Sequence, residues 1–232
     1  MHFEAFSTFI LFITFYGPIL SKFQYALFRL TLQLLFNKSK CLNGKNLEQI
    51  SVVKLLGIIL TEDLKYEENT NHICKRAFAR ISMVTKLKYV VVPLEDLINV
   101  YILFVRSLLE YCSVVWHSSL TLEQSYNIER VQRTALKVIL GGNYSDYDSA
   151  LKECGLESLF DRRESRCLTF GLRCLKHPKH QAMFPMHEDE NVEISLRDRN
   201  KFRVNFAQTT SYQQSSVPYI QNMLNDHFHK TI

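Results

Sequence analysis

Residues 93–116, PLEDLINVYILFVRSLLEYCSVVW, predict one long amphipathic helix around which the rest of the chain is organised. Pro93 suits the first helical position, where the N–H that proline lacks would have no partner. Glu95 and Asp96 suit the positive end of the helix dipole. Phe104 and its apolar neighbours widen the face, so we expect protein to surround the helix on most sides. Apolar residues recur at the helical spacings of three and four: Leu94, Leu97, Ile98, Tyr101, Val105, Leu108, Leu109, Cys112 and Trp116.

Length and composition indicate one or two folded domains. The chain has 232 residues, 12% of them aromatic, with few glycines and prolines, which argues against disorder. A net charge of +5 permits a polyanionic partner without requiring one. The cysteines form no C-x-x-C pair, and we interpret them as reduced core residues of an intracellular protein, in the cytoplasm or nucleus. They are Cys41, Cys74, Cys112, Cys154, Cys167 and Cys174.

The first 36 residues differ from the rest of the chain. Residues 3–20 are almost uncharged and just long enough to span a bilayer, but Gly17 and Pro18 interrupt them. A second apolar piece carries Lys22 and Arg29, which a membrane-spanning helix disfavours. Three interpretations remain open: a membrane anchor within residues 3–36, a buried helical hairpin, or a sequence that is not native to the domain behind it.

The predicted fold class is mainly α, a helical bundle with a small β-strand or hairpin near residues 50–60 and a hydrophobic N-terminal helical segment. Gly57 lies inside the β segment and predicts a bend or a close backbone approach. Thr121, Ser145 and Ser158 are expected to cap helices. We divide the chain into residues 1–36, 37–65, 66–178 and 179–232, the last being a linker and a C-terminal helical tail.

Two predicted helices carry positive charge that acidic residues do not balance. No acid lies between Asn69 and Leu94, whereas ordinary solvated helices mix both signs. On the helix that follows Thr121, three basic residues form a single stripe that Glu129 partly offsets. These stretches favour phosphate binding. The basic residues are Lys75, Arg76, Arg80, Lys86 and Lys88 on the first helix and Arg130, Arg133 and Lys137 on the second.

The sequence contains no motif for catalysis. It has no Gly-rich phosphate loop, no G-x-S-x-G, no H-E-x-x-H and no Y-x-D-D. Cys167, Cys174, His177 and His180 are zinc-binding residue types. Their spacing on a helix does not converge, so we interpret them as core cysteines and surface histidines. We therefore expect no catalytic residue, no metal site and no cofactor in this chain.

Laid end to end, several segments resemble the end of the palm and the thumb of reverse transcriptases from non-LTR retrotransposons, the jockey- and LINE-like elements. KLLGI at 54–58, followed by His72-Ile73 and a basic helix, resembles the family's K-x-L-G strand and H-I pair, although Tyr66 stands near the expected Trp. VRSLLEYCSVVWH at 105–117 is similar to V-R-S-x-L-E-Y-C-S-x-V-W. IERVQRTA at 128–135 and LESLFDRR at 156–163 resemble L-E-x-V-Q-R-x-A and L-x-x-L-x-x-R-R, and the resemblance extends over residues 52–226.

The resemblance implies a truncated or degenerate fragment of an RNA-directed DNA polymerase. The family's catalytic aspartates, which hold Mg²⁺, would precede residue 37, where the sequence has its apolar segment, so this chain alone is not expected to polymerise. A thumb holds a template–primer duplex by its backbone, and we assign those contacts to the eight basic residues above. Residues 37–65 would be the palm edge, with Lys54, Leu55, Leu56 and Gly57 as a primer-grip-like strand, and residues 66–178 the thumb.

Several aspects of this interpretation concern side-chain roles and alternative functions. Glu110, Tyr111 and Trp116 are assigned to packing and internal polar pairing, and Arg133 fits either that role or the basic stripe. The whole chain could instead be a helical protein-interaction module that does not bind nucleic acid. It could also be a membrane-anchored helical protein, and its oligomeric state is not predicted.

Overall fold

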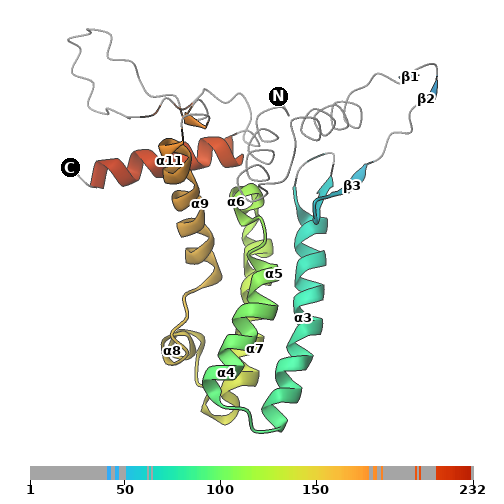
Figure 1. The fold of residues 1–232 in the computed structure, drawn as a ribbon, viewed down its shortest axis with the longest axis vertical. Helices are drawn as coiled ribbons and strands as arrows, with labels where there is room; N and C mark the ends of the chain where they lie inside the picture. The colour runs from blue at the N-terminus through green and yellow to red at the C-terminus, as the bar shows by residue number, and fades with distance from the viewer. Residues whose placement is uncertain are drawn as a thin grey trace.

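The computed structural model of the protein describes residues 51–61, 63, 65–177, 180, 181, 184, 202, 204 and 213–230, with backbone alone at 41, 42, 45, 46 and 230. Its long helices run side by side (Figure 1). In chain order they are α3 (Glu67–Tyr89), α4 (Leu94–Val100) with its continuation, and α7 (Leu122–Leu140). The predicted fold class, mainly helical with a small hairpin, is confirmed in this part of the chain. The apolar segment predicted within residues 1–36 lies outside it.

The main core forms where these three helices meet. Each contributes apolar residues at spacings of three and four, so that one face of every helix turns inward. The wholly buried Trp116 closes the core at one end. The buried faces are Ile73, Ala77, Ile81 and Val84 from α3; Leu97, Tyr101, Val105 and Leu109 from the middle stretch; and Ile128, Val131, Ala135 and Ile139 from α7.

The C-terminal half adds two smaller clusters. The short helix α8 (Tyr147–Glu153) packs Ala150 against the end of α7, while α11 (Ser216–Lys230) lies across the end of α9 (Leu159–Lys176) (Figure 1). Gly171 allows this crossing, because a Cβ there would meet Ile220 Cγ2 at 2.6 Å. Cys167 and Cys174 are buried in the cluster between α9 and α11.

The prediction of one continuous helix over residues 93–116 is wrong. Pro93 precedes the first helical residue, and α4 passes through a π-helix, η1 (Tyr101–Arg106), into α5 (Ser107–Leu109). The chain then breaks at Cys112, which has a left-handed φ of 52°, and α6 (Ser113–Trp116) begins a segment bent by 41° from α4–α5. Part of the expected burial is wrong as well, since Leu103 and Phe104 are 67% and 47% exposed.

The break has a physical reason in the partners of its carbonyl groups. A helix that ends inside a protein leaves carbonyls that need hydrogen bonds. Arg166 Nη1 donates to the Glu110 carbonyl at 3.2 Å, and Trp116 Nε1 donates to the Tyr111 carbonyl at 3.0 Å. Trp116 is only five residues from Tyr111, whereas Arg166 comes from α9, so the break depends in part on a partner that is distant in the sequence.

The predicted β segment is a hairpin. β3 (Val52–Leu55) pairs with β4 (Ile58–Thr61) through the two-residue turn Leu56-Gly57, whose φ angles of 47° and 87° are both positive, as a type I′ turn requires. A Cβ on Gly57 would lie 3.3 Å from the Tyr111 ring, and the Tyr111 hydroxyl donates to the Leu56 carbonyl at 2.9 Å. The bend predicted at Gly57 is confirmed, and the group that lies against it is the side chain of Tyr111. A separate two-stranded pair joins β1 (Cys41–Leu42) to β2 (Lys45–Asn46).

Helix caps largely follow the sequence signals. Thr121 and Gln124 form the expected capping box at the start of α7, and Ser158 accepts from the Asp161 N–H at the start of α9. The cap of α8 is Asp146, which accepts from the Ser149 N–H, so the prediction of Ser145 is wrong. Short 3₁₀ turns, η2 (His117–Ser119) and η3 (Gly141–Asn143), precede and follow α7.

Two further properties of the described residues bear on the sequence predictions. The five cysteines among them, Cys74, Cys112, Cys154, Cys167 and Cys174, are buried free thiols. No single described helix has the length and apolar character of a membrane span, although the bent pair Leu94–Leu109 and Ser113–Ser119 passes that test by composition and length.

Candidate nucleic-acid interface

The outward face of α3 carries the least restrained positive charges of the predicted set. Lys75, Arg76 and Lys86 are exposed, and within the described part of the chain they make no hydrogen bond or ion pair. Each therefore presents a free cationic head group to solvent, as a phosphate contact requires.

Arg80 and Lys88 have structural roles that the sequence did not reveal. Arg80 Nη1 donates to the Phe104 carbonyl on η1 at 2.6 Å, and Lys88 Nζ donates to the Ile139 carbonyl near the end of α7 at 2.7 Å. These two side chains fasten α3 to both neighbouring helices, so a phosphate would compete with their existing contacts.

The basic stripe on α7 lies over aromatic rings. Arg130 stands 5.6 Å from the centroid of Phe78 on α3, and Lys137 stands 5.4 Å from that of Tyr144. Arg133 contacts two rings, Tyr147 at 4.8 Å and Tyr126 at 5.4 Å, so it takes part in packing as well as in the stripe. At exposed sites such contacts are worth about 0.5–1 kcal/mol each, which positions the side chains while leaving N–H groups for a second partner.

The segment predicted to be a primer-grip-like strand, of which Lys54 and Leu55 lie on β3 and Leu56 and Gly57 in the turn, joins this surface at the start of α3. Burial lowers the pKa of His72, and the charges of Lys54, Arg76 and Lys75 lower it further, because all three lie near the imidazole. Lys54 is exposed on β3, whereas Leu55 packs against the main core. The hairpin thus adds a fourth positive charge to one end of the α3 face.

No described acidic residue forms an ion pair with the predicted basic residues of α3 and α7. The ion pairs among the described residues use Asp63, Glu110 and Glu157, and none of them involves any of the eight predicted basic residues. Since α3 packs along α7, the two basic faces belong to one pair of adjacent helices.

The buried acid of the middle stretch, Glu110, forms ion pairs with arginines outside the predicted basic set. Glu110 is 4% exposed, and its carboxylate pairs with Arg162 at 2.5 Å, Arg166 at 3.4 Å and Arg106 at 3.8 Å. Trp116 is wholly buried and donates through Nε1 to the Tyr111 carbonyl, and the Tyr111 hydroxyl binds the hairpin turn. The structure therefore places these three residues in packing and internal polar contacts, in agreement with the sequence prediction.

A second buried polar group went unnoticed in the sequence. Arg163 is wholly buried, and it donates through Nε to His117 Nδ1 at 3.2 Å and through Nη2 to Ser125 Oγ at 3.0 Å. The available signal was its position, since Arg163 falls in the apolar series Leu159, Cys167, Phe170 and Cys174 of α9, where a charge is out of place.

His117 predicts an acid-sensitive stability. Burial, and then the charge of Arg163, lower the pKa of His117 to about 4 from an ordinary 6.5. Between these values the unfolded chain binds a proton that the folded protein does not, so stability is full above pH 6.5 and falls as the pH drops towards 4. The shift corresponds to roughly 3 kcal/mol.

The measurement is the free energy of unfolding from urea titrations at pH values from neutral to 4.5, for the wild type and for H117Q. Because carboxylates titrate in the same range, the difference between the two curves isolates the imidazole. The wild type should lose about 2–3 kcal/mol more than H117Q over this interval. Parallel curves would contradict the assignment.

Comparisons with known proteins add no identification. No family model, no curated protein and no solved structure matches this chain.

Proposed function

We propose that this chain derives from the palm edge and thumb of a non-LTR retrotransposon reverse transcriptase and binds the backbone of a template–primer duplex without regard to sequence. We assign it no catalytic step, because the polymerase aspartates of that family have no counterpart in the sequence. The resemblance over residues 52–226 motivates the family, and a helical bundle with an adjoining hairpin agrees with it.

The observation that carries the binding proposal is the unneutralised charge on adjacent helices. Lys75, Arg76 and Lys86 on α3 and Arg130 and Lys137 on α7 are exposed and have no acidic partner among the described residues. Lysine and arginine heads on such a face neutralise phosphates and release counterions, which is the sequence-independent term of nucleic-acid affinity.

Sequence independence can be tested with two labelled RNA–DNA duplexes of equal length and unrelated sequence. Phosphate contacts carry no sequence information, so their dissociation constants, measured by fluorescence anisotropy at one salt concentration, should agree within about twofold. A difference above about tenfold would indicate base readout and contradict the proposal, as would the absence of binding to both duplexes.

The alternative function, a helical protein-interaction module, has one specific observation in its favour. Leu103 and Phe104 stand exposed on the π-helix, and π-helical turns are frequent at functional sites. Retention of a protein partner by the wild type but not by a Leu103→Ser and Phe104→Ser double variant, together with no duplex binding, would favour this function.

A further inference from the structure

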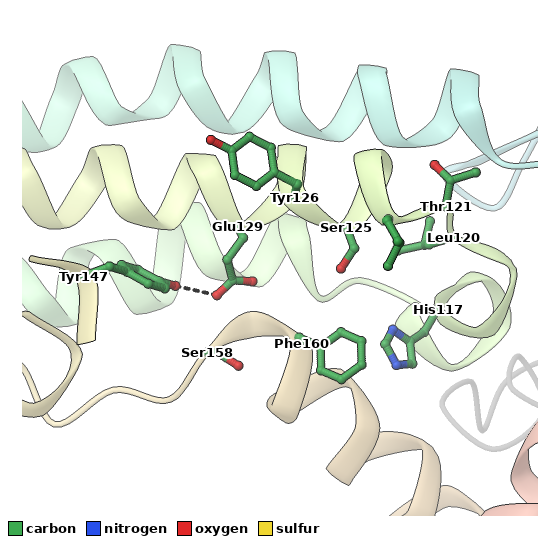
Figure 2. Close-up of a pocket in the computed structure, with 10 residues that line it drawn as sticks. His117, Leu120, Thr121, Ser125, Tyr126, Glu129, Tyr147, Ser158 and Phe160 are labelled. Atoms are coloured by element: carbon green, nitrogen blue, oxygen red, sulfur yellow. Dashed lines mark hydrogen bonds between the residues drawn. The ribbon is translucent and has the colours of Figure 1, made fainter.

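Figure 2 shows the lining of a pocket of about 330 Å³. The pocket adjoins the basic stripe of α7, because Arg133 contacts the rings of Tyr126 and Tyr147, which line it. Tyr126, Ser125 and Glu129 line it from α7, Tyr147 from α8, and Phe160 from the start of α9. Tyr126 and Phe160 are 55% and 44% exposed. Two solvent-facing aromatic rings therefore belong to the lining of a cavity that also contains a carboxylate.

The carboxylate of Glu129 has one free oxygen. Its Oε1 accepts from the Leu159 N–H at 3.0 Å and from the Tyr147 hydroxyl. Its Oε2 is buried and has no hydrogen-bond partner among the described residues. Figure 2 shows this second oxygen turned away from Tyr147, towards the side of the pocket formed by Ser125 and Phe160. A buried acceptor without a partner costs about 1–3 kcal/mol, so a ligand that supplies a donor here would recover that energy.

The buried guanidinium of Arg163 lies behind the pocket residues His117 and Ser125. Arg163 is held by His117 and Ser125, both of which line the pocket, and its Nη1 has no hydrogen-bond partner in the described structure. Burial lowers the pKa of Arg163, and the charge of Glu129 opposes that effect, which places the two groups within electrostatic reach of each other. Arg163 itself does not line the pocket, so it supplies positive charge behind the wall, and the unpartnered oxygen of Glu129 is the acceptor in the lining.

The charges around the pocket disfavour an ionic occupant. An anion would meet the carboxylate of Glu129. A cation would meet Arg163, and also Arg133, whose guanidinium lies 4.8 Å from the Tyr147 ring. A neutral, flat molecule with an N–H fits better, because aromatic rings flank the cavity and the unpartnered oxygen of Glu129 would gain a donor.

We propose that the pocket receives an unpaired nucleobase from a single strand whose backbone follows the α7 stripe. Every base has a flat face for stacking and an edge that places a donor beside an acceptor. Arg133 connects the backbone-binding stripe to the pocket. It belongs to the stripe, and its guanidinium stacks on Tyr126 and Tyr147, which line the pocket. This inference rests on the proposed nucleic-acid function and adds to it a site for a base.

The test compares two labelled strands with identical phosphates. One strand of roughly ten nucleotides is abasic throughout, and the other carries a single central base, tried as each of the four bases in turn. Stacking in the pocket should make the best single-base strand bind about 5- to 100-fold more tightly than the abasic strand. The ratio of the two dissociation constants cancels the backbone contribution.

Variants locate the effect. Phe160→Ala and Tyr126→Ala remove exposed rings and should bring the ratio close to one. Glu129→Gln, which puts an amide in place of the carboxylate, should lower the ratio too. Tyr89→Ala, which removes an 82% exposed ring at the C-terminal end of α3, should leave the ratio unchanged. If Glu129→Gln does not fold, the two ring variants decide the question.

The outcomes separate this inference from the proposed function. Equal binding of both strands by the wild type would overturn the base pocket and leave backbone binding intact. A ratio that survives both ring substitutions would place the base elsewhere and also overturn the pocket. Failure to bind either strand or any duplex would overturn both.

Discussion

Replacing Glu110 with alanine should lower the free energy of unfolding by about 3–5 kcal/mol, the usual cost of removing one partner from a buried ion pair. The side chain of Glu110 is 5% exposed, and the three arginines around it, Arg106, Arg162 and Arg166, have side-chain exposures of 13%, 26% and 49%. Without the carboxylate, Arg106 and Arg162 keep their charges in a poorly hydrated site. The measurement is urea unfolding followed by the fluorescence of Trp116, the single tryptophan, which is wholly buried in the folded protein.

Glu157 provides a matched control for this prediction. Its carboxylate also pairs with Arg162, at 3.6 Å, but its side chain is 67% exposed. Exposed pairs contribute little, so Glu157→Ala should change stability by no more than about 0.5 kcal/mol. A loss below about 1 kcal/mol for Glu110→Ala, or equal losses for the two variants, would show that burial does not govern this cluster.

Neutralising the free charges of α3 should weaken duplex binding strongly. The triple variant Lys75→Ala, Arg76→Ala and Lys86→Ala removes three exposed cations that make no hydrogen bond or ion pair in the described structure, so folding should be unaffected. If each contacts one phosphate, the affinity for an RNA–DNA duplex at moderate salt should fall by roughly 10- to 100-fold. Fluorescence anisotropy with one labelled duplex measures the change.

An equal loss of charge elsewhere separates local contacts from net charge. Lys152→Ala, Arg173→Ala and Lys176→Ala remove three exposed cations from α8 and α9, on the opposite side of the bundle from α3 (Figure 1). This control variant should bind within about threefold of the wild type, since screening limits the reach of distant charges. Equal losses for both triple variants would mean that the overall charge, and not the α3 face, attracts the duplex.

Local patterns in the sequence predicted most of the fold. Apolar spacings of three and four located α3 and α7, and the capping signals at Thr121 and Ser158 placed the starts of α7 and α9. Gly57 marked both the hairpin turn and the contact with Tyr111. These features succeed because neighbouring residues determine them.

Features that depend on distant partners could not be predicted in this way. The break after α5 contains neither glycine nor proline, and the carbonyl of Glu110 accepts a hydrogen bond from the distant Arg166 on α9. The fastening roles of Arg80 and Lys88 likewise depend on carbonyls of other helices. The pocket joins Glu129 to Tyr147 and Phe160, which lie on three different helices, so no local pattern marks it.

The dependence of duplex affinity on salt tests the central claim most directly. For phosphate contacts, the logarithm of the binding constant falls linearly with the logarithm of the salt concentration, by about 0.9 per phosphate neutralised. We expect a steep linear fall for the wild type and a slope shallower by roughly 2–3 for the variant lacking Lys75, Arg76 and Lys86, with the wild-type slope retained in the α8–α9 control. Binding that is indifferent to salt, or an unchanged slope in the α3 variant, would contradict the account.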